Sequence, residues 1–142
     1  MRTVLVSPVP GDAAASGTAL LNAIAGITDA SVTNPYLVKI EPGVFDLGNS
    51  TLTTKLYVDI EGSGRLVTTI TSGAALTIDD SASVELRSLT LLNKALTSSP
   101  AVIGANGGFV RLRDALVYIN GGSTSSTGIY APTGNSGATL RD

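Results

Sequence analysis

The 142-residue sequence contains no histidine, cysteine, tryptophan or glutamine, and aromatic residues make up only 4% of it. Without cysteine there is no disulfide framework, and without histidine a Ser-His-Asp or Cys-His catalytic arrangement is excluded. Charged residues are also scarce at 14%, with a net charge of −2, which gives no electrostatic basis for binding nucleic acid or an anionic membrane. We therefore expect no nucleic-acid partner, no membrane partner and no cofactor.

Long apolar runs are missing as well. The apolar N-terminal stretch is broken by Pro8 and Pro10, so it does not resemble a secretion signal, and no run is long enough to span a bilayer. The chain nevertheless holds 43% hydrophobic residues and 16 glycines, enough for a core. This composition favours one domain of short strands joined by tight turns.

A short motif repeats along the second half of the chain. Val-x-Leu-Arg occurs at 84–87 and 110–113 and returns as Ala-Thr-Leu-Arg at 138–141, so the two intervals are nearly equal. The segments at 38–41 and 58–61 show the same alternation of apolar and polar residues. Such alternation is typical of strands with one buried face, and a repeat period of this size, roughly 20 to 30 residues, indicates a solenoid.

These repeats predict an all-β fold, a parallel β-helix with an N-terminal capping α-helix. The general preference for right-handed crossovers favours right-handed coils. The helix is expected within 11–28, where Leu20, Ile24 and Ile27 share one helical face. We expect residues 1–142 to form a single β-helix domain. Within it, 1–10 would be an N-terminal strand and linker, 36–142 the coils, and the C-terminal end uncapped.

The repeat also predicts the register of the strands. The side chains expected to stack inside are Val84, Val110 and Ala138, and Leu86, Leu112 and Leu140. Two ladders are expected outside, one of Asp59, Glu85, Arg111 and Thr139, the other of Glu61, Arg87, Arg113 and Arg141. Glu85 is expected to pair with Arg111, and Glu61 with Arg87. An uncovered strand edge recruits other strands, so self-association through the C-terminal end is expected.

Several segments resemble the N-terminal coils of pectin methylesterases and the wider pectate-lyase-like β-helix superfamily. They are Tyr-Leu-Val-Lys-Ile-Glu-Pro-Gly-Val-Phe at 36–45, Ile-Glu-Gly-Ser-Gly-Arg at 60–65 and Thr-Ile-Thr-Ser-Gly at 69–73, preceded by the apolar segment 19–27. The resemblance spans roughly 13–98 and implies a right-handed parallel β-helix with three sheets. The esterases of that family use two glutamines as an oxyanion hole. Because this chain has none, the resemblance does not imply their reaction.

Few residues stand out as a site, and no catalytic residue is assigned. Asp79 and Asp80 are weak candidates for a metal or acid-base pair, but neighbours on a strand point to opposite faces, which favours a solvated turn. Tyr118 and Tyr130 are weak candidates for stacking on sugar rings, although two partly buried rings at turns is the simpler interpretation. Asp114 occupies the place that Ser88 holds one coil earlier, and this repetition favours a structural role.

The sequence thus favours a non-catalytic structural or adhesive β-helix module that self-assembles through its open end, as in a phage fibre or a bacterial surface or filament protein. An extracellular, cell-surface or virion location is expected with it. The alternative is a carbohydrate-binding module or a fragment of a polysaccharide-active enzyme. A cell-surface or extracellular glycan is then the expected partner.

Overall fold

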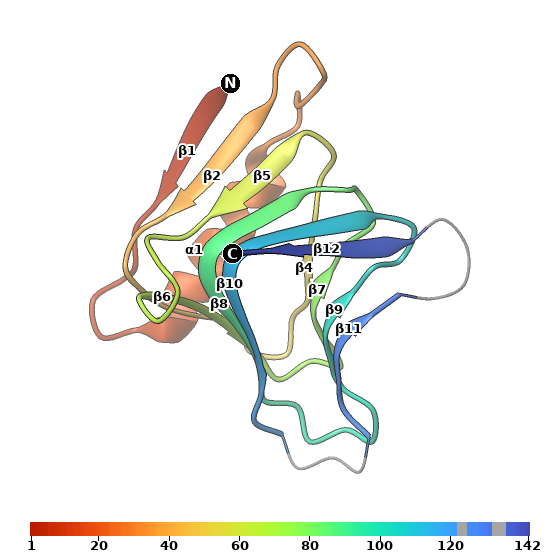
Figure 1. Cartoon of the computed structure of the whole chain (residues 1–142). Helices are drawn as coiled ribbons and strands as arrows, with labels where there is room; N and C mark the ends of the chain where they lie inside the picture. The colour runs from red at the N-terminus through yellow and green to blue at the C-terminus, as the bar shows by residue number, and fades with distance from the viewer. Residues whose placement is uncertain (122–124, 132–135) are drawn as a thin grey trace.

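The structure is a computed structural model that describes residues 1–121, 125–131 and 136–142. It is a parallel β-solenoid of about four turns with one α-helix near the N-terminus (Figure 1). The elements in chain order are β1 (Arg2–Val6), α1 (Ala13–Gly26), β2 (Tyr36–Ile40), β3 (Gly43–Asp46), β4 (Leu52–Thr53), β5 (Val58–Glu61), β6 (Thr68–Ser72), β7 (Leu76–Asp79), β8 (Glu85–Asn93), β9 (Ala101–Gly104), β10 (Phe109–Ile119), β11 (Thr127–Tyr130) and β12 (Gly137–Arg141).

The solenoid has three faces. The first runs in the order β1-β2-β5-β8-β10-β12, the second joins β3 and β6 to the later halves of β8 and β10, and the third runs β4-β7-β9-β11. Because β8 and β10 continue around a corner, the first two faces form one hydrogen-bonded sheet of eight strands. At that corner Ser88 and Asp114 adopt left-handed backbone angles, with φ of 53° and 47°. The repeated position is thus a shared bend in the chain.

The strand register follows the repeat in the second half of the chain. Leu112 lies beside both Leu86 and Leu140, and Ile60 lies beside Leu86. Aligning the segments 38–41 and 58–61 by their shared alternation would match Val38 with Val58, whereas in the structure Val38 pairs with Ile60. The first coil is therefore two residues out of phase with the alignment, and the turns absorb the difference.

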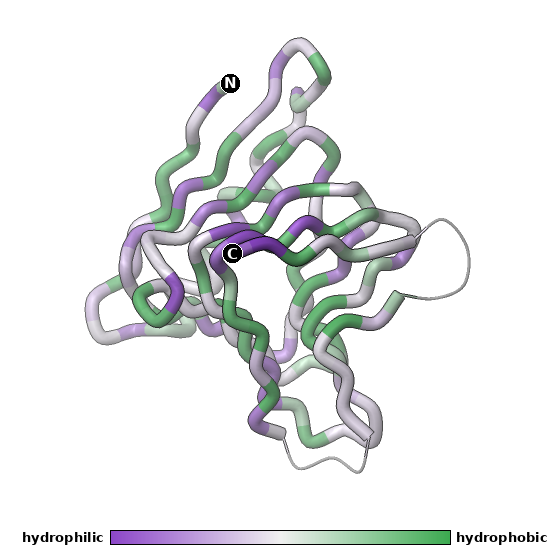
Figure 2. Tube along the Cα trace, in the orientation of Figure 1, coloured by the Kyte–Doolittle hydropathy of each residue, from purple (hydrophilic) through white to green (hydrophobic). Residues whose placement is uncertain are grey.

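The core is a set of apolar columns running along the solenoid axis, and Figure 2 shows the alternation of hydrophobic and hydrophilic residues along the strands that produces them. Val84, Leu86, Val110 and Leu112 are buried as predicted. Leu140, which was expected inside, is 67% exposed, and Ala138 is exposed as well. Both lie on β12, the last strand of its sheet, so no further rung covers them.

Helix α1 covers the opposite end of the solenoid. Its first turn is capped by Asp12, whose carboxylate accepts a hydrogen bond from the Ala15 N–H at 2.8 Å. Leu20 and Ile24 are buried against the core. Gly17 lies so close to the backbone at Asp46, on β3, that a side chain there would overlap its carbonyl oxygen. The glycine thus allows the helix to approach the strand closely.

Strand β1 is part of the solenoid rather than a separate lead-in. It pairs in parallel with β2, with Val4 beside Val38, and so forms the first rung of the first face. The sequence predicted the strand but not this pairing, because the whole of α1 lies between the two partners along the chain. Among the described residues, no helix has the length and apolar character needed to cross a bilayer.

Candidate functional site

The two adjacent acids that the sequence singled out face different surroundings. Asp79 accepts a hydrogen bond from the Asn106 side-chain amide at 2.7 Å, at the surface. Asp80 is fully buried, and its Oδ1 accepts a hydrogen bond from the Thr54 hydroxyl at 2.9 Å. Within the described part of the chain, no group of three or more acidic, histidine or cysteine side chains is placed to hold a metal ion. The two carboxylates therefore do not converge on a common ligand.

Asp80 is unusual because a buried carboxylate normally has all its oxygens satisfied. Its Oδ2 makes no hydrogen bond of good geometry within the described residues. Burial raises the pKa of this carboxyl group. The Thr54 hydroxyl and the nearby backbone N–H groups of Ala82 and Val84 offset that rise only in part, and the charge of Asp79 adds to it. The ionised form of Asp80 is thus disfavoured by its place in the core.

The two tyrosines are both 51% exposed but lie on different strands, Tyr118 on β10 and Tyr130 on β11. Tyr130 lines a hollow of about 480 Å³ over the third face of the solenoid. Its other walls are formed by small and polar side chains and one leucine, namely Ala75, Leu76, Ser99, Ala101, Asn106, Ser125 and Thr127. Tyr118 is not part of this hollow, so the structure does not bring the tyrosines together.

A chain of ion pairs crosses the outer surface of the first face. Glu61 contacts Arg87 at 2.6 Å and Lys39 at 3.8 Å. Glu85 contacts Arg87 at 3.1 Å and Arg113 at 3.3 Å. The expected pair between Glu61 and Arg87 is confirmed.

The expected pair between Glu85 and Arg111 is wrong. Glu85 and Arg111 are direct neighbours across the strands, yet Glu85 contacts Arg113 instead. The guanidinium group of Arg113 reaches Glu85 diagonally, as long side chains on a sheet can. Arg111 is thereby left without that carboxylate.

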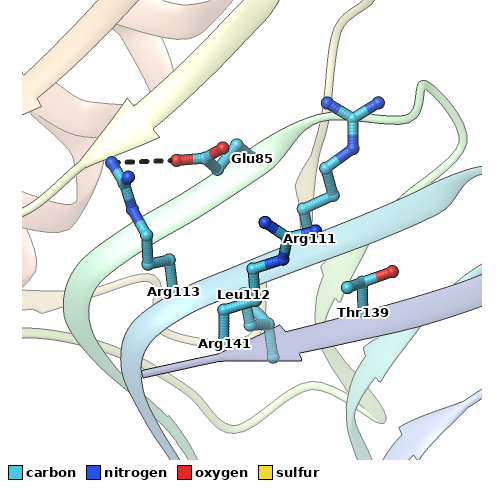
Figure 3. Close-up of a pocket in the computed structure, with 6 residues that line it drawn as sticks. All are labelled: Glu85, Arg111, Leu112, Arg113, Thr139 and Arg141. Atoms are coloured by element: carbon cyan, nitrogen blue, oxygen red, sulfur yellow. Dashed lines mark ion pairs between the residues drawn. The ribbon is translucent and has the colours of Figure 1, made fainter.

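Three arginines lie where this chain of ion pairs ends, with the guanidinium group of Arg113 beside Glu85 and that of Arg111 pointing away from it (Figure 3). Arg111, Arg113 and Arg141 extend from the outer face of β10 and β12, on the same side as Glu85 (Figure 3). Together with Thr139 and Leu112 they line a hollow of about 350 Å³. Sequence reasoning placed these arginines in ladders but did not identify a site, although the run of arginines at 87, 113 and 141 was visible in the repeat. The sequence predicted that these arginines stack in register, but it could not show that Glu85 would contact Arg113 and not Arg111.

A second hollow lies at the open end of the first face. It has a volume of about 270 Å³ and is lined by Leu112, Ala115, Leu140, Arg141 and Asp142. Leu112 and Leu140 belong to the apolar column of the core, so this hollow opens onto the core rather than onto the charged face. This hollow therefore suits contact with another apolar surface.

Comparison of the chain with models of protein families, with curated proteins and with solved structures gives no match in any of the three. The likeness to pectin methylesterases and pectate lyases therefore rests on the residues quoted above. What the structure supports is the parallel β-solenoid itself.

Proposed function

We propose that the chain is a non-catalytic structural module whose solenoid stacks head to tail on further copies of itself, as part of a fibre or filament on a virion or bacterial surface. The observation that carries this proposal is the exposure of Leu140. It continues a column of core side chains at Val38, Ile60, Leu86 and Leu112, yet it is 67% exposed on the outermost strand. Covering it with another apolar rung is favourable.

The other end of the same sheet offers a fitting partner strand. Strands β1 and β12 are both five residues long, lie at opposite ends of one parallel sheet, and each has one edge without a neighbouring strand in the described structure. Adding β1 of one copy to β12 of another continues the sheet and sets Val4 over Leu140. Such a contact joins two different surfaces and does not close on itself, so it produces a linear assembly.

The test is the mass in solution by light scattering at several concentrations, with electron microscopy of the same samples. We expect mass to grow with concentration for the natural chain and to stay monomeric for Leu140→Glu, because a carboxylate on the apolar column opposes stacking. The matched control is Leu96→Glu, at a leucine that is 83% exposed on a loop away from the end, which should assemble normally. A natural chain that is monomeric at every concentration overturns the proposal.

A carbohydrate-binding role is the second candidate, and the hollow beside Tyr130 favours it. An exposed aromatic ring flanked by hydroxyl and amide groups offers stacking and hydrogen bonds to a sugar. Tyr130→Ala should then abolish saturable oligosaccharide binding on a glycan array. Tyr118→Ala serves as the control, because that ring is equally exposed but lies outside the hollow. Equal loss from both substitutions, or no glycan bound by the natural chain, counts against this role.

A further inference from the structure

Like charges face each other on three consecutive rungs of the first face. Arg87 lies in register with Arg113, and Arg113 with Arg141. Neighbouring strands are about 4.8 Å apart, so unneutralised arginines at this spacing repel one another. A carboxylate between them, or a bound anion, relieves this repulsion.

The carboxylates are distributed unevenly among these rungs. Arg87 contacts both Glu61 and Glu85, and Arg113 shares Glu85. Arg141 and Arg111 have no ion pair with any residue in 1–121, 125–131 or 136–142. The acid nearest in sequence, Asp142, lines the apolar hollow at the end of the sheet and not the arginine hollow. The positive charges of Arg111 and Arg141 are thus not neutralised by an ion pair within the described residues.

The charges around the hollow set the kind of ligand it can take. Three guanidinium groups and the single carboxylate of Glu85 line it, which leaves a net charge of +2. The chain as a whole carries −2, so this concentration of positive charge is local. Guanidinium groups bind planar or tetrahedral oxyanions through paired N–H donors, and the hydroxyl of Thr139 adds one further donor.

We infer that the hollow formed by Arg111, Arg113, Arg141 and Thr139 binds the dianionic phosphate of a phosphomonoester. A phosphomonoester is doubly charged above a pKa of about 6, which matches the excess charge, and its three acceptor oxygens can each take a hydrogen bond from a guanidinium group or from the Thr139 hydroxyl. A carboxylate or a sulfate ester carries one charge and neutralises only half of the excess. The arginines extend from the outer face of the sheet whereas stacking uses the edge of β12, so this inference does not depend on the proposed function.

The first part of the test measures the binding of three ligands by titration calorimetry at neutral pH and constant ionic strength. The ligands are phenyl phosphate, phenyl sulfate and inorganic phosphate. Phenyl phosphate and phenyl sulfate have similar shapes but differ by one charge. We expect phenyl phosphate to bind at least about tenfold more tightly than phenyl sulfate, as expected when a second charge-assisted contact is made. Inorganic phosphate is the third ligand. If it binds more tightly than phenyl phosphate, the hollow is a site for free phosphate and not the phosphomonoester site proposed here.

The protein arm compares arginine substitutions with a matched loss of charge. Arg111→Ala and Arg141→Ala should each weaken phenyl phosphate about tenfold. Lys39→Ala removes one positive charge from the same face, three rungs before Arg113, and should leave the affinity unchanged. Thermal unfolding of each variant confirms that it is folded; Arg111 and Arg141 are exposed.

Three outcomes overturn the inference. Equal binding of phenyl sulfate and phenyl phosphate contradicts the charge argument. An equal loss from Lys39→Ala means that the general field of the surface, and not the hollow, attracts the anion. No binding of phenyl phosphate to the natural chain at millimolar concentrations means that the arginines do not form a site.

Discussion

The two ends of the solenoid differ in how far they bury leucine and isoleucine side chains. At the N-terminal end α1 buries Leu20 and Ile24 completely or almost completely, whereas at the C-terminal end Leu140 on β12 is 67% exposed. Leu140 nevertheless occupies the same column as Leu86, which is fully buried. The same apolar position of the repeat is therefore buried on β8, which has a strand on both sides, and exposed on β12, which has one on a single side. Periodicity predicts which way a side chain points, and the adjacent rung decides whether water reaches it.

The largest effect is expected where a column residue is truncated between two covered rungs. Leu86→Ala should lower the free energy of unfolding by about 2–5 kcal/mol, because it leaves a cavity in a close-packed core. Leu140→Ala, the same substitution two rungs along the same column, should change it by less than about 0.5 kcal/mol, as at other exposed sites. Chemical denaturation of the two variants, measured at low protein concentration to limit assembly, gives both values.

Two results would undermine this comparison. A large loss of stability from Leu140→Ala at low concentration would mean that the last rung is packed as tightly as the inner ones. A small loss from Leu86→Ala would mean that the core collapses around the cavity.

A smaller but clear effect is expected from loosening the covered end. Gly17→Ala places a methyl group against the Asp46 carbonyl oxygen, and relieving that overlap should cost about 1–3 kcal/mol. Gly26→Ala is the matched control, because it lies in the same helix with nothing near its added methyl group, and alanine there should be neutral or stabilising by up to about 1 kcal/mol. Thermal melts of the pair give the difference. If both variants melt alike, α1 does not pack closely on β3.

The smallest effect concerns Asp80, the core acid between the two ends. Its pKa is raised by burial, so its contribution to stability is full below the unfolded pKa of about 3.9 and is lost as pH rises through the folded pKa. Asp80→Asn should therefore stabilise the protein at neutral pH by about 1 kcal/mol and remove this part of the pH dependence. Denaturation curves at several pH values measure both effects.

Two other residues control for this pH experiment. Asp46 acts in the opposite direction. Burial is the largest single influence and opposes its ionisation, but the hydrogen bonds from Lys94 and from the Gly48 N–H, together with the charge of Lys94, outweigh it and lower the pKa of Asp46, so its contribution to stability is lost as pH falls. The variant must accordingly be compared with the natural chain at each pH. Asp79→Asn removes the neighbouring charge, which adds to the rise in the pKa of Asp80, so it should reduce this part of the pH dependence without removing it. An Asp80→Asn variant that is less stable at neutral pH contradicts the prediction.

The sequence predicted most of the fold, because the alternation of apolar and polar residues and the repeat period together fix how the strands align. The stacking of Leu86 on Leu112 and the helix within 11–28 follow from short-range patterns. The repeated position of Ser88 and Asp114 indicated a structural role, but the bend there is seen only in the structure. The pairing of Val38 with Ile60 was not predicted, because a repeat search does not show the length of a turn. The exposure of Leu140 could not be predicted from its own segment, since it depends on what lies on the next rung.

The candidate sites were less predictable. Asp79 and Asp80 were expected to point apart, but the burial of Asp80 beneath Thr54 depends on the coil before it. The hollow beside Tyr130 is lined by residues on β7 and β9, and no sequence motif links those residues to Tyr130. The arginine hollow arises because Glu85 reaches Arg113 in preference to Arg111, a choice made by side-chain reach and not by spacing.

The length of chain between stacked partners is uneven along the solenoid. It is longest between Val4 and Val38, where α1 intervenes, and shortest between Val38 and Ile60. At intermediate lengths the same column then continues through Leu86, Leu112 and Leu140. Turn length is thus uncoupled from rung stacking, and even a whole helix fits between two neighbouring strands. A solenoid built in this way accepts insertions at its corners without losing its core, so new surface loops can be added to it one coil at a time.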